Sequence, residues 1–228
     1  MKFLLLMLLP FVAFGAAAQS IGDFSLVDQD GVFHQMSYYN DNDYVVLISQ
    51  GESDDPISLY QVSDFVQERY KGNKIKTFLI NPTGTGEVSN ESFPVLIDDN
   101  QLASDALGIT YYGDIIFFNP KTLSVETVVA GTGDLVPYNT ATFVSYSNDI
   151  APIIADNCAV CHREGGIAPF ALDSNVMAKA WAPVIREVLM TKQMPPGQLD
   201  PKHQGQFSNG RVLASSDIQK VVSWVNEG

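Results

Sequence analysis

The sequence predicts two domains, an α/β domain over residues 20–135 and an all-α domain over residues 147–228. In the first domain, short apolar segments alternate with segments of helical period, as a sheet covered by helices requires. In the second domain, apolar residues recur at helical spacing only. Residues 136–146 contain a proline and small polar residues without a helical period, which is typical of a linker. A chain of 228 residues is long enough for two such domains.

Each element of the α/β domain follows from a local pattern. The turn residues 28–31 lie between two short apolar segments, which predicts a hairpin. The continuous apolar run 44–48 predicts a buried central strand. After it, Pro56 and the spaced apolar residues of 59–66 predict a helix. The remaining expected elements are strands at 75–80, 93–97, 115–118 and 125–129 and a short helix at 101–107.

Three helical segments are expected in the all-α domain. The first is capped by Ser147 and runs into Cys158 with isoleucines on one face. The second lies around residues 181–191 and ends before the two prolines at 195–196. The last is capped by Ser215 or Ser216 and carries valines and an isoleucine at helical spacing.

The first 18 residues predict export. One basic residue, an apolar run and three alanines form a secretory signal with a small-residue cleavage site. No later segment has the length and apolarity of a membrane span, so we expect a periplasmic protein without an integral membrane segment. The net charge of −13 argues against binding to nucleic acid or to an anionic lipid surface. It suits docking to a basic partner, or solubility alone.

Both cysteines of the chain lie in the sequence Cys158-Ala159-Val160-Cys161-His162. This spacing is the attachment pattern of a c-type haem. The two thiols can add to the haem vinyl groups, and the adjacent histidine can bind the iron from the same side. A zinc site would need two further ligands at finger-like spacing, and no other cysteine is present. A redox dithiol or a structural disulfide would leave the histidine without a role.

The α/β domain resembles the redoxin, or thioredoxin-like, family, which implies an α/β sandwich. The matching stretches are residues 44–49, 93–99 and 106–120. Where the family keeps its redox cysteines, residues 50–58 contain none, and where it often has a cis-proline this chain has Gly113. Because thiol chemistry requires the cysteine, the resemblance implies that the fold is kept and the thiol activity is lost.

Residues 147–228 resemble a small class I cytochrome c. They resemble more closely the cytochrome modules beside copper type II, ascorbate-dependent monooxygenase domains. This resemblance implies one haem c, bound covalently by Cys158 and Cys161, with His162 and Met194 as axial ligands of the iron. A methionine is otherwise more often a core residue, and Met190 or His203 are the alternative ligands. The stretches that carry the resemblance are residues 161–170, 181–187, 193–196, 207–209 and 224–228.

Together these features predict an exported electron carrier with one haem and an inactive redoxin-like domain that docks redox partner proteins. The resemblance implies a copper monooxygenase, or another periplasmic oxidoreductase, as such a partner. One alternative is an oxidoreductase that reduces peroxide at the haem, which would need an open sixth iron position. Another is the electron-transfer part of a longer monooxygenase chain, because in that family a catalytic domain can follow the cytochrome.

Overall fold

The computed structural model describes residues 19–50, 66, 68, 70–82, 93–129, 133–134, 144–196 and 211–228. We call residues 19–134 the sheet domain and residues 144–228 the helical domain. The predicted signal segment 1–18 lies outside the described residues. The sheet domain contains β1 (Gln19–Ser20), β2 (Ser25–Asp28), β3 (Phe33–Gln35), a 3-10 turn (Met36–Tyr39), β4 (Tyr44–Ser49), β5 (Ile75–Asn81), β6 (Val95–Ile97), α2 (Leu102–Leu107), β7 (Tyr111–Tyr112), β8 (Ile115–Asn119), β9 (Ser124–Val129) and β10 (Gly133–Asp134).

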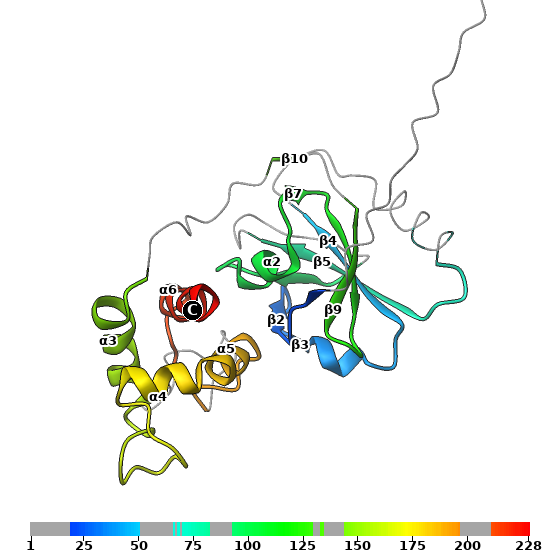
Figure 1. The fold of residues 1–228 in the computed structure, drawn as a ribbon. Coiled ribbons are helices and arrows are strands. Elements are labelled where there is room, and N and C mark those ends of the chain that lie inside the picture. Colours follow the sequence, from blue (N-terminus) through cyan, green and yellow to red (C-terminus); the bar gives the residue numbers. More distant parts are fainter. Residues whose placement is uncertain are drawn as a thin grey trace, which may run out of the picture.

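Eight strands form one mixed sheet in the order β1-β9-β8-β4-β5-β6-β2-β3 (Figure 1). The pairs β4–β5 and β5–β6 are parallel, and the other neighbours are antiparallel. The order confirms the predicted central strand, because β4 lies between β8 and β5. The predicted strands 75–80, 115–118 and 125–129 are also confirmed, whereas the expected strand 93–97 is shorter and begins at Val95.

The central strand buries side chains on both faces of the sheet. Val45 and Leu47 belong to one apolar cluster, and Val46 and Ile48 belong to a second cluster on the opposite face. Successive residues of a strand point to opposite faces, so a continuous apolar run fits a strand covered on both sides. Val66 is helical and belongs to the second cluster, which places the end of the predicted helix there. The rest of that helix lies outside the described residues.

The predicted hairpin joins β2 and β3 and is held by Asp28. Its Oδ1 accepts from the backbone amides of Asp30 and Val32 at 2.9 and 2.8 Å. Its Oδ2 contacts the Nε2 of His34 at 2.9 Å, and the Nδ1 of His34 contacts the hydroxyl of Tyr39 at 2.6 Å. These bonds lower the pKa of Asp28 against the opposing effect of burial, which is the larger single influence. His34 is therefore a buried structural residue.

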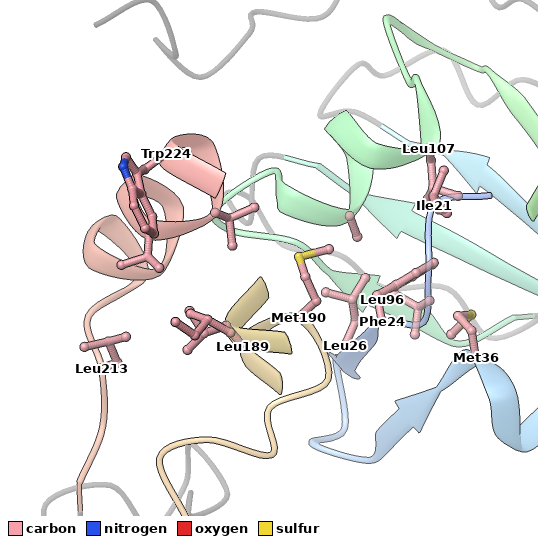
Figure 2. Packing of buried hydrophobic residues seen from close by; sticks show 14 of the residues in the cluster. Ile21, Phe24, Leu26, Met36, Leu96, Leu107, Leu189, Met190, Leu213 and Trp224 are labelled. Carbon is pink, nitrogen blue, oxygen red and sulfur yellow. The ribbon is translucent and has the colours of Figure 1, made fainter. Parts of the chain in front are cut away.

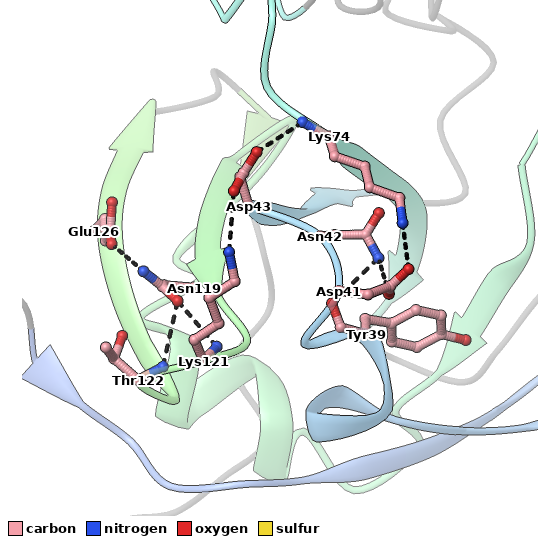
Figure 3. A network of polar contacts seen from close by, with 9 residues as sticks. All are labelled: Tyr39, Asp41, Asn42, Asp43, Lys74, Asn119, Lys121, Thr122 and Glu126. Carbon is pink, nitrogen blue, oxygen red and sulfur yellow. Dashed lines mark hydrogen bonds and ion pairs between the residues drawn. The ribbon is translucent and has the colours of Figure 1, made fainter.

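A network of exposed charges lies where β4 and β5 begin and β8 ends (Figure 3). Lys74 bonds Asp41, and Lys121 bonds Asp43 at 3.0 Å. Asn119 closes the β8–β9 turn by accepting from the backbone amide of Lys121 at 2.9 Å. Water and salt screen such exposed pairs, so this network orders the rim of the sheet more than it stabilises the fold.

The helical domain differs from expectation at its helix starts. The first helical stretch begins at Tyr146 and not after Ser147, because the Ser145 hydroxyl caps it by accepting from the amide of Asn148 at 3.4 Å. Neither Ser215 nor Ser216 caps the last helix, whose first flanking residue is Ala214. The domain contains two π-helical segments (Tyr146–Ile150 and Ile154–Cys158), α3 (Ala151–Ile153), α4 (Asn175–Ala180), α5 (Ala182–Met190) and α6 (Ser215–Glu227).

Buried residues of the two domains belong to one apolar cluster, and most of the predicted linker lies outside the described residues. The end of the predicted linker is packed: Val144 is buried, and the ring centre of Tyr146 lies 5.6 Å from that of Trp224. In Figure 1, α5 and α6 lie between the sheet and the α3–α4 end of the molecule. None of the helices in the described part of the chain has the length and apolarity that crossing a membrane requires.

Candidate functional site

The motif residues Cys158, Cys161 and His162 occupy a single turn. Cys158 ends a π-helical segment, and its carbonyl accepts from the amides of Cys161 and His162 at 3.1 and 2.8 Å. Both cysteines are half-buried and free, so the thiols are not joined to each other. The turn therefore places two thiols and one imidazole within one short segment of backbone, as the sequence predicted.

The imidazole of His162 is oriented by a backbone carbonyl. Its Nδ1 lies 3.2 Å from the oxygen of Phe170, and the two rings lie 4.6 Å apart. A carbonyl oxygen can only accept, so Nδ1 carries the proton and Nε2 keeps its lone pair. Histidines that bind metals commonly donate their other ring N–H in this way. Sequence reasoning missed this contact, because it joins residues eight positions apart through a loop.

The loop after the motif folds back onto it. The amide of Ala168 donates to the Cys161 carbonyl at 3.1 Å, and the amide of Leu172 donates to the His162 carbonyl at 2.8 Å. Gly166 lies in this loop close to the motif backbone, and a Cβ at its position would lie 2.3 Å from the Cys161 carbonyl oxygen. The glycine is thus required by close backbone approach, and the loop holds both motif residues from outside the turn.

Aromatic stacking connects this loop to α5. The ring of Phe170 lies 4.0 Å from that of Trp181, with an interplanar angle of 11°. Trp181 directly precedes the first residue of α5 and is half-buried. The structure thus places Trp181 beside the candidate site. Trp224, in contrast, is buried in the core.

The surroundings of the motif suit an apolar group. Burial raises the pKa of the Cys158 thiol, so that side chain is a poor thiolate nucleophile. Two apolar side chains of this region face solvent, Val160 at 41% and Ile167 at 90% exposure. Two free thiols and an Nε2 with its lone pair, beside exposed apolar residues, are groups that could hold a haem covalently. The residues present therefore fit a haem.

Met194 lies at the other end of α5. Its backbone amide donates to the Val188 carbonyl at 3.1 Å, and its side chain is 38% exposed. Met190 is buried, as expected for a core residue, and His203 lies outside the described residues. Within the described part of the chain, no three His, Cys, Asp or Glu side chains group to hold a bare metal ion.

The position where redoxins carry their cysteines begins at the end of β4. There the amide of Gly113 donates to the Ser49 carbonyl at 2.8 Å, so the predicted facing residue does meet the end of the central strand. The φ angle of Gly113 is 87°, a conformation that favours glycine. Residues 51–65, including most of the cysteine-free stretch 50–58, lie outside the described residues.

Comparisons with known proteins give fold-level likenesses only. No family model matches the chain, and no curated protein matches it. Solved structures similar to it include an exposed lipoprotein thioredoxin from Streptococcus pneumoniae (20% identity, TM-score 0.38, covering 50% of this chain and 92% of that one). A putative thiol:disulfide interchange protein from Chlorobium tepidum (15%, 0.38, 49% and 82%) and a peroxidoxin from Mycobacterium tuberculosis (15%, 0.38, 50% and 84%) are also similar.

These likenesses cover about half of the chain and are too low to indicate activity. The strand order gives more direct information on the fold, with three central parallel strands, β4, β5 and β6, flanked by antiparallel strands. Parallel neighbours of this kind need crossover connections, and helical residues 66 and 68 lie on the crossover between β4 and β5. The mixed sheet with its helices fits a thioredoxin-like α/β domain.

Proposed function

We propose that the protein is an exported c-type cytochrome that carries electrons through one covalently bound haem. Cys158 and Cys161 would hold the haem through thioethers, His162 would bind the iron through Nε2, and Met194 would be the second axial ligand. When bound, the haem supplies the one-electron couple between Fe(II) and Fe(III). The redoxin-like part of the chain would dock the redox partner and would have no thiol activity of its own.

One observation carries this proposal. The Nδ1 of His162 donates to the Phe170 carbonyl, 3.2 Å away, within the same turn that holds both free thiols. A histidine that binds a metal usually donates its other ring N–H, which fixes its tautomer, whereas a histidine without a ligand role beside a dithiol has no such requirement. The Phe170–Trp181 stack then fixes the loop that supplies the carbonyl.

Other residues of the site have supporting roles. The exposed Arg163, next to His162, can pair with a haem propionate, and a surface charge is the alternative role. The half-buried Phe170 and Trp181 would exclude water from one side of the imidazole. The haem would exchange electrons with its partners by outer-sphere transfer. The proposed partner is a copper monooxygenase or another periplasmic oxidoreductase.

A second function, haem-dependent reduction of peroxide, is favoured by the placement of Met194. Its side chain is 38% exposed at the far end of α5 from Trp181. If Met194 does not bind the iron, the sixth position is open to small ligands, as a peroxidase requires. The two functions therefore differ in whether Met194 occupies the sixth iron position, and cyanide binding followed by optical spectroscopy distinguishes them.

The test is the optical spectrum of the purified full-length protein, oxidised and reduced, with and without cyanide. An electron carrier with Met194 bound should show a six-coordinate low-spin spectrum and bind cyanide slowly. Met194→Ala should bind cyanide rapidly, and Met190→Leu should behave like the wild type. Rapid cyanide binding by the wild type together with peroxide turnover would favour the second function.

The thiol part of the proposal has its own test. The full-length haem-loaded protein should not reduce insulin disulfides, because its two cysteines would be consumed by thioether bonds. Turnover that persists after haem loading would contradict the inactive assignment of the redoxin-like domain.

A further inference from the structure

We propose that the sheet domain clamps α5 and the Met194 segment, and thereby controls whether Met194 reaches the iron. This inference rests on the proposed function, because it concerns the second axial ligand of the same haem. This contact would be a function of the sheet domain that does not require a thiol. The two domains contact each other through an apolar cluster, through hydrogen bonds and through a cavity that residues of both domains line.

The apolar contact involves the last residues of α5. Leu189 and Met190 lie in the same buried cluster as Phe24, Leu26 and Leu96 of the sheet domain (Figure 2). Figure 2 shows the Met190 side chain directed toward these sheet residues. Removal of such apolar surface from water is the dominant favourable term in docking. The C-terminal end of α5 is therefore packed against the sheet domain.

Hydrogen bonds fix the same helix to the first two strands. The Ser25 hydroxyl, which is buried, donates to the Met190 carbonyl at 3.4 Å. This carbonyl is one of the last four of α5, which have no partner within the helix. One turn earlier, Arg186 donates through Nη1 to the Ile21 carbonyl at 3.2 Å and through Nε to Asn226 at 3.0 Å. Ser25 of β2 thus bonds the last carbonyl of α5, and Ile21, which directly follows β1, bonds the Arg186 side chain of the same helix.

Lys192, just after the helix, forms a further contact with the sheet domain. Its φ angle of 56° turns the chain away from α5. Its side chain lines a small cavity of about 30 Å³ together with Asp98, Asp99 and Ser25 of the sheet domain. Lys192 therefore lies where the end of α5 meets two acidic residues of the sheet domain. Removing its charge at this position would weaken the contact between the two domains.

Met194 follows Lys192 by two residues. The amides of Gln193 and Met194 both donate to the Val188 carbonyl, at 2.8 and 3.1 Å. The backbone at Met194 therefore moves with the end of α5. Whatever displaces that end from the sheet domain also displaces the thioether.

His162, in contrast, is held at the opposite end of α5. Phe170 binds its ring and stacks on Trp181, which precedes the helix. The nine residues of α5 span about 14 Å at 1.5 Å per residue. One axial ligand thus belongs to the helical domain, and the segment carrying the other is anchored on the sheet domain. Because both ligand segments are attached to α5, the packing of its C-terminal end on the sheet domain then determines whether Met194 reaches the iron.

The test uses Lys192→Gln in the full-length haem-loaded protein, with Lys220→Gln as the matched control. Lys220 lies on the exposed face of α6 and loses the same charge. We expect Lys192→Gln to raise the rate of cyanide binding to the ferric protein about tenfold, and Lys220→Gln to leave it unchanged. Ser25→Ala, which removes a single hydrogen bond, should give a smaller rise of about two- to threefold.

Amide hydrogen exchange of residues 188–194 provides a readout that needs no haem. It should be faster in Lys192→Gln and Ser25→Ala than in the wild type, with residues 158–162 unchanged. Equal exchange and equal cyanide rates in all variants would overturn the clamp.

Met194→Ala separates this failure from a failure of the proposed function. If Met194→Ala speeds cyanide binding and Lys192→Gln does not, the clamp is wrong and the ligand assignment stands. If Met194→Ala changes nothing, Met194 is not the ligand, and the clamp on ligation fails with it.

Discussion

The sheet domain and the helical domain bury their apolar residues to different extents. Of the twelve largest fully buried side chains among the described residues, only Ile150 belongs to the helical domain. The sheet domain contributes four phenylalanines to that set. Both domains leave apolar side chains exposed: Val160, Ile167, Val176, Val184, Met194 and Val212 in the helical domain, and Val32, Phe33, Tyr38, Tyr111 and Val128 in the sheet domain. Among the described residues, the largest fully buried side chains thus lie almost entirely in the sheet domain.

This difference indicates what each domain needs for stability. A helical unit of this size has a small hydrophobic core, which a cofactor or a neighbouring domain can extend. Here the sheet domain covers the α5–α6 side through a common cluster. The motif side, with Val160 and Ile167 exposed, is the side that the proposed haem would complete.

The largest expected effect comes from removing the haem attachment. Cys158→Ala combined with Cys161→Ala should abolish haem-dependent staining on a denaturing gel. Because the proposed haem would be held by the helical domain, the thermal transition of that domain should move to lower temperature by more than the transition of the sheet-domain β-structure, followed by circular dichroism. A colourless wild-type protein that contains zinc would contradict this prediction.

The next effect concerns the iron ligand in the helical domain. A thioether donates weakly and stabilises Fe(II), so Met194→His should lower the midpoint potential. The expected fall is on the order of 0.1 V, within the span of about 0.8 V that axial ligands cover. Met190→Leu is the control, since that swap roughly conserves core volume. A larger shift in Met190→Leu than in Met194→His would place the ligand one helical turn earlier.

At the boundary between the domains, Asp98 should make stability depend on pH. Complete burial raises its pKa to about 6, although Ser104 and Ala103 donate hydrogen bonds that oppose the shift. The folded state therefore holds a proton that the unfolded state releases near the ordinary value of 3.8. This contribution is fully present below 3.8 and is lost as the pH rises through 6, a decrease of about 3 kcal/mol in the free energy of unfolding.

Asp98→Asn should remove this slope, because an amide mimics the protonated acid. Chemical denaturation at a series of pH values between 4 and 7 measures it. Asp156→Asn, an exposed residue of the helical domain, is the matched control and should retain the slope. If Asp98→Asn and the wild type respond equally to pH, another group is responsible.

The smallest expected effect contrasts one glycine in each domain. Gly166→Ala would place a Cβ 2.3 Å from the Cys161 oxygen, so we expect a loss of about 2 kcal/mol and incomplete haem attachment. Gly72→Ala in the sheet domain meets no atom within 4 Å but has a φ of 98°, and should cost about 1 kcal/mol with normal attachment. Denaturant unfolding and haem content per protein measure both. Normal haem content in Gly166→Ala would show that the loop does not support the motif.

Local patterns in the sequence were sufficient for most elements of the fold. The run 44–48 predicts the central strand because a strand buried on both faces needs apolar residues at every position. Turn residues 28–31 predict the hairpin, and β4 and β5 pair in parallel as alternating elements require. The motif residues themselves were also identified from spacing, since Cys-x-x-Cys-His places three reactive groups on one turn.

Only the tertiary structure decided how these pieces meet. The choice of Ser145 over Ser147 as a cap shifts the helix start by two residues, which apolar periodicity does not resolve. The bond from His162 to the Phe170 carbonyl depends on the path of a loop with two glycines. The placement of Lys192 beside Asp98 and Asp99 joins residues more than 90 positions apart. Local propensity contains no information on such long-range contacts, because they arise when separate apolar faces find a common core.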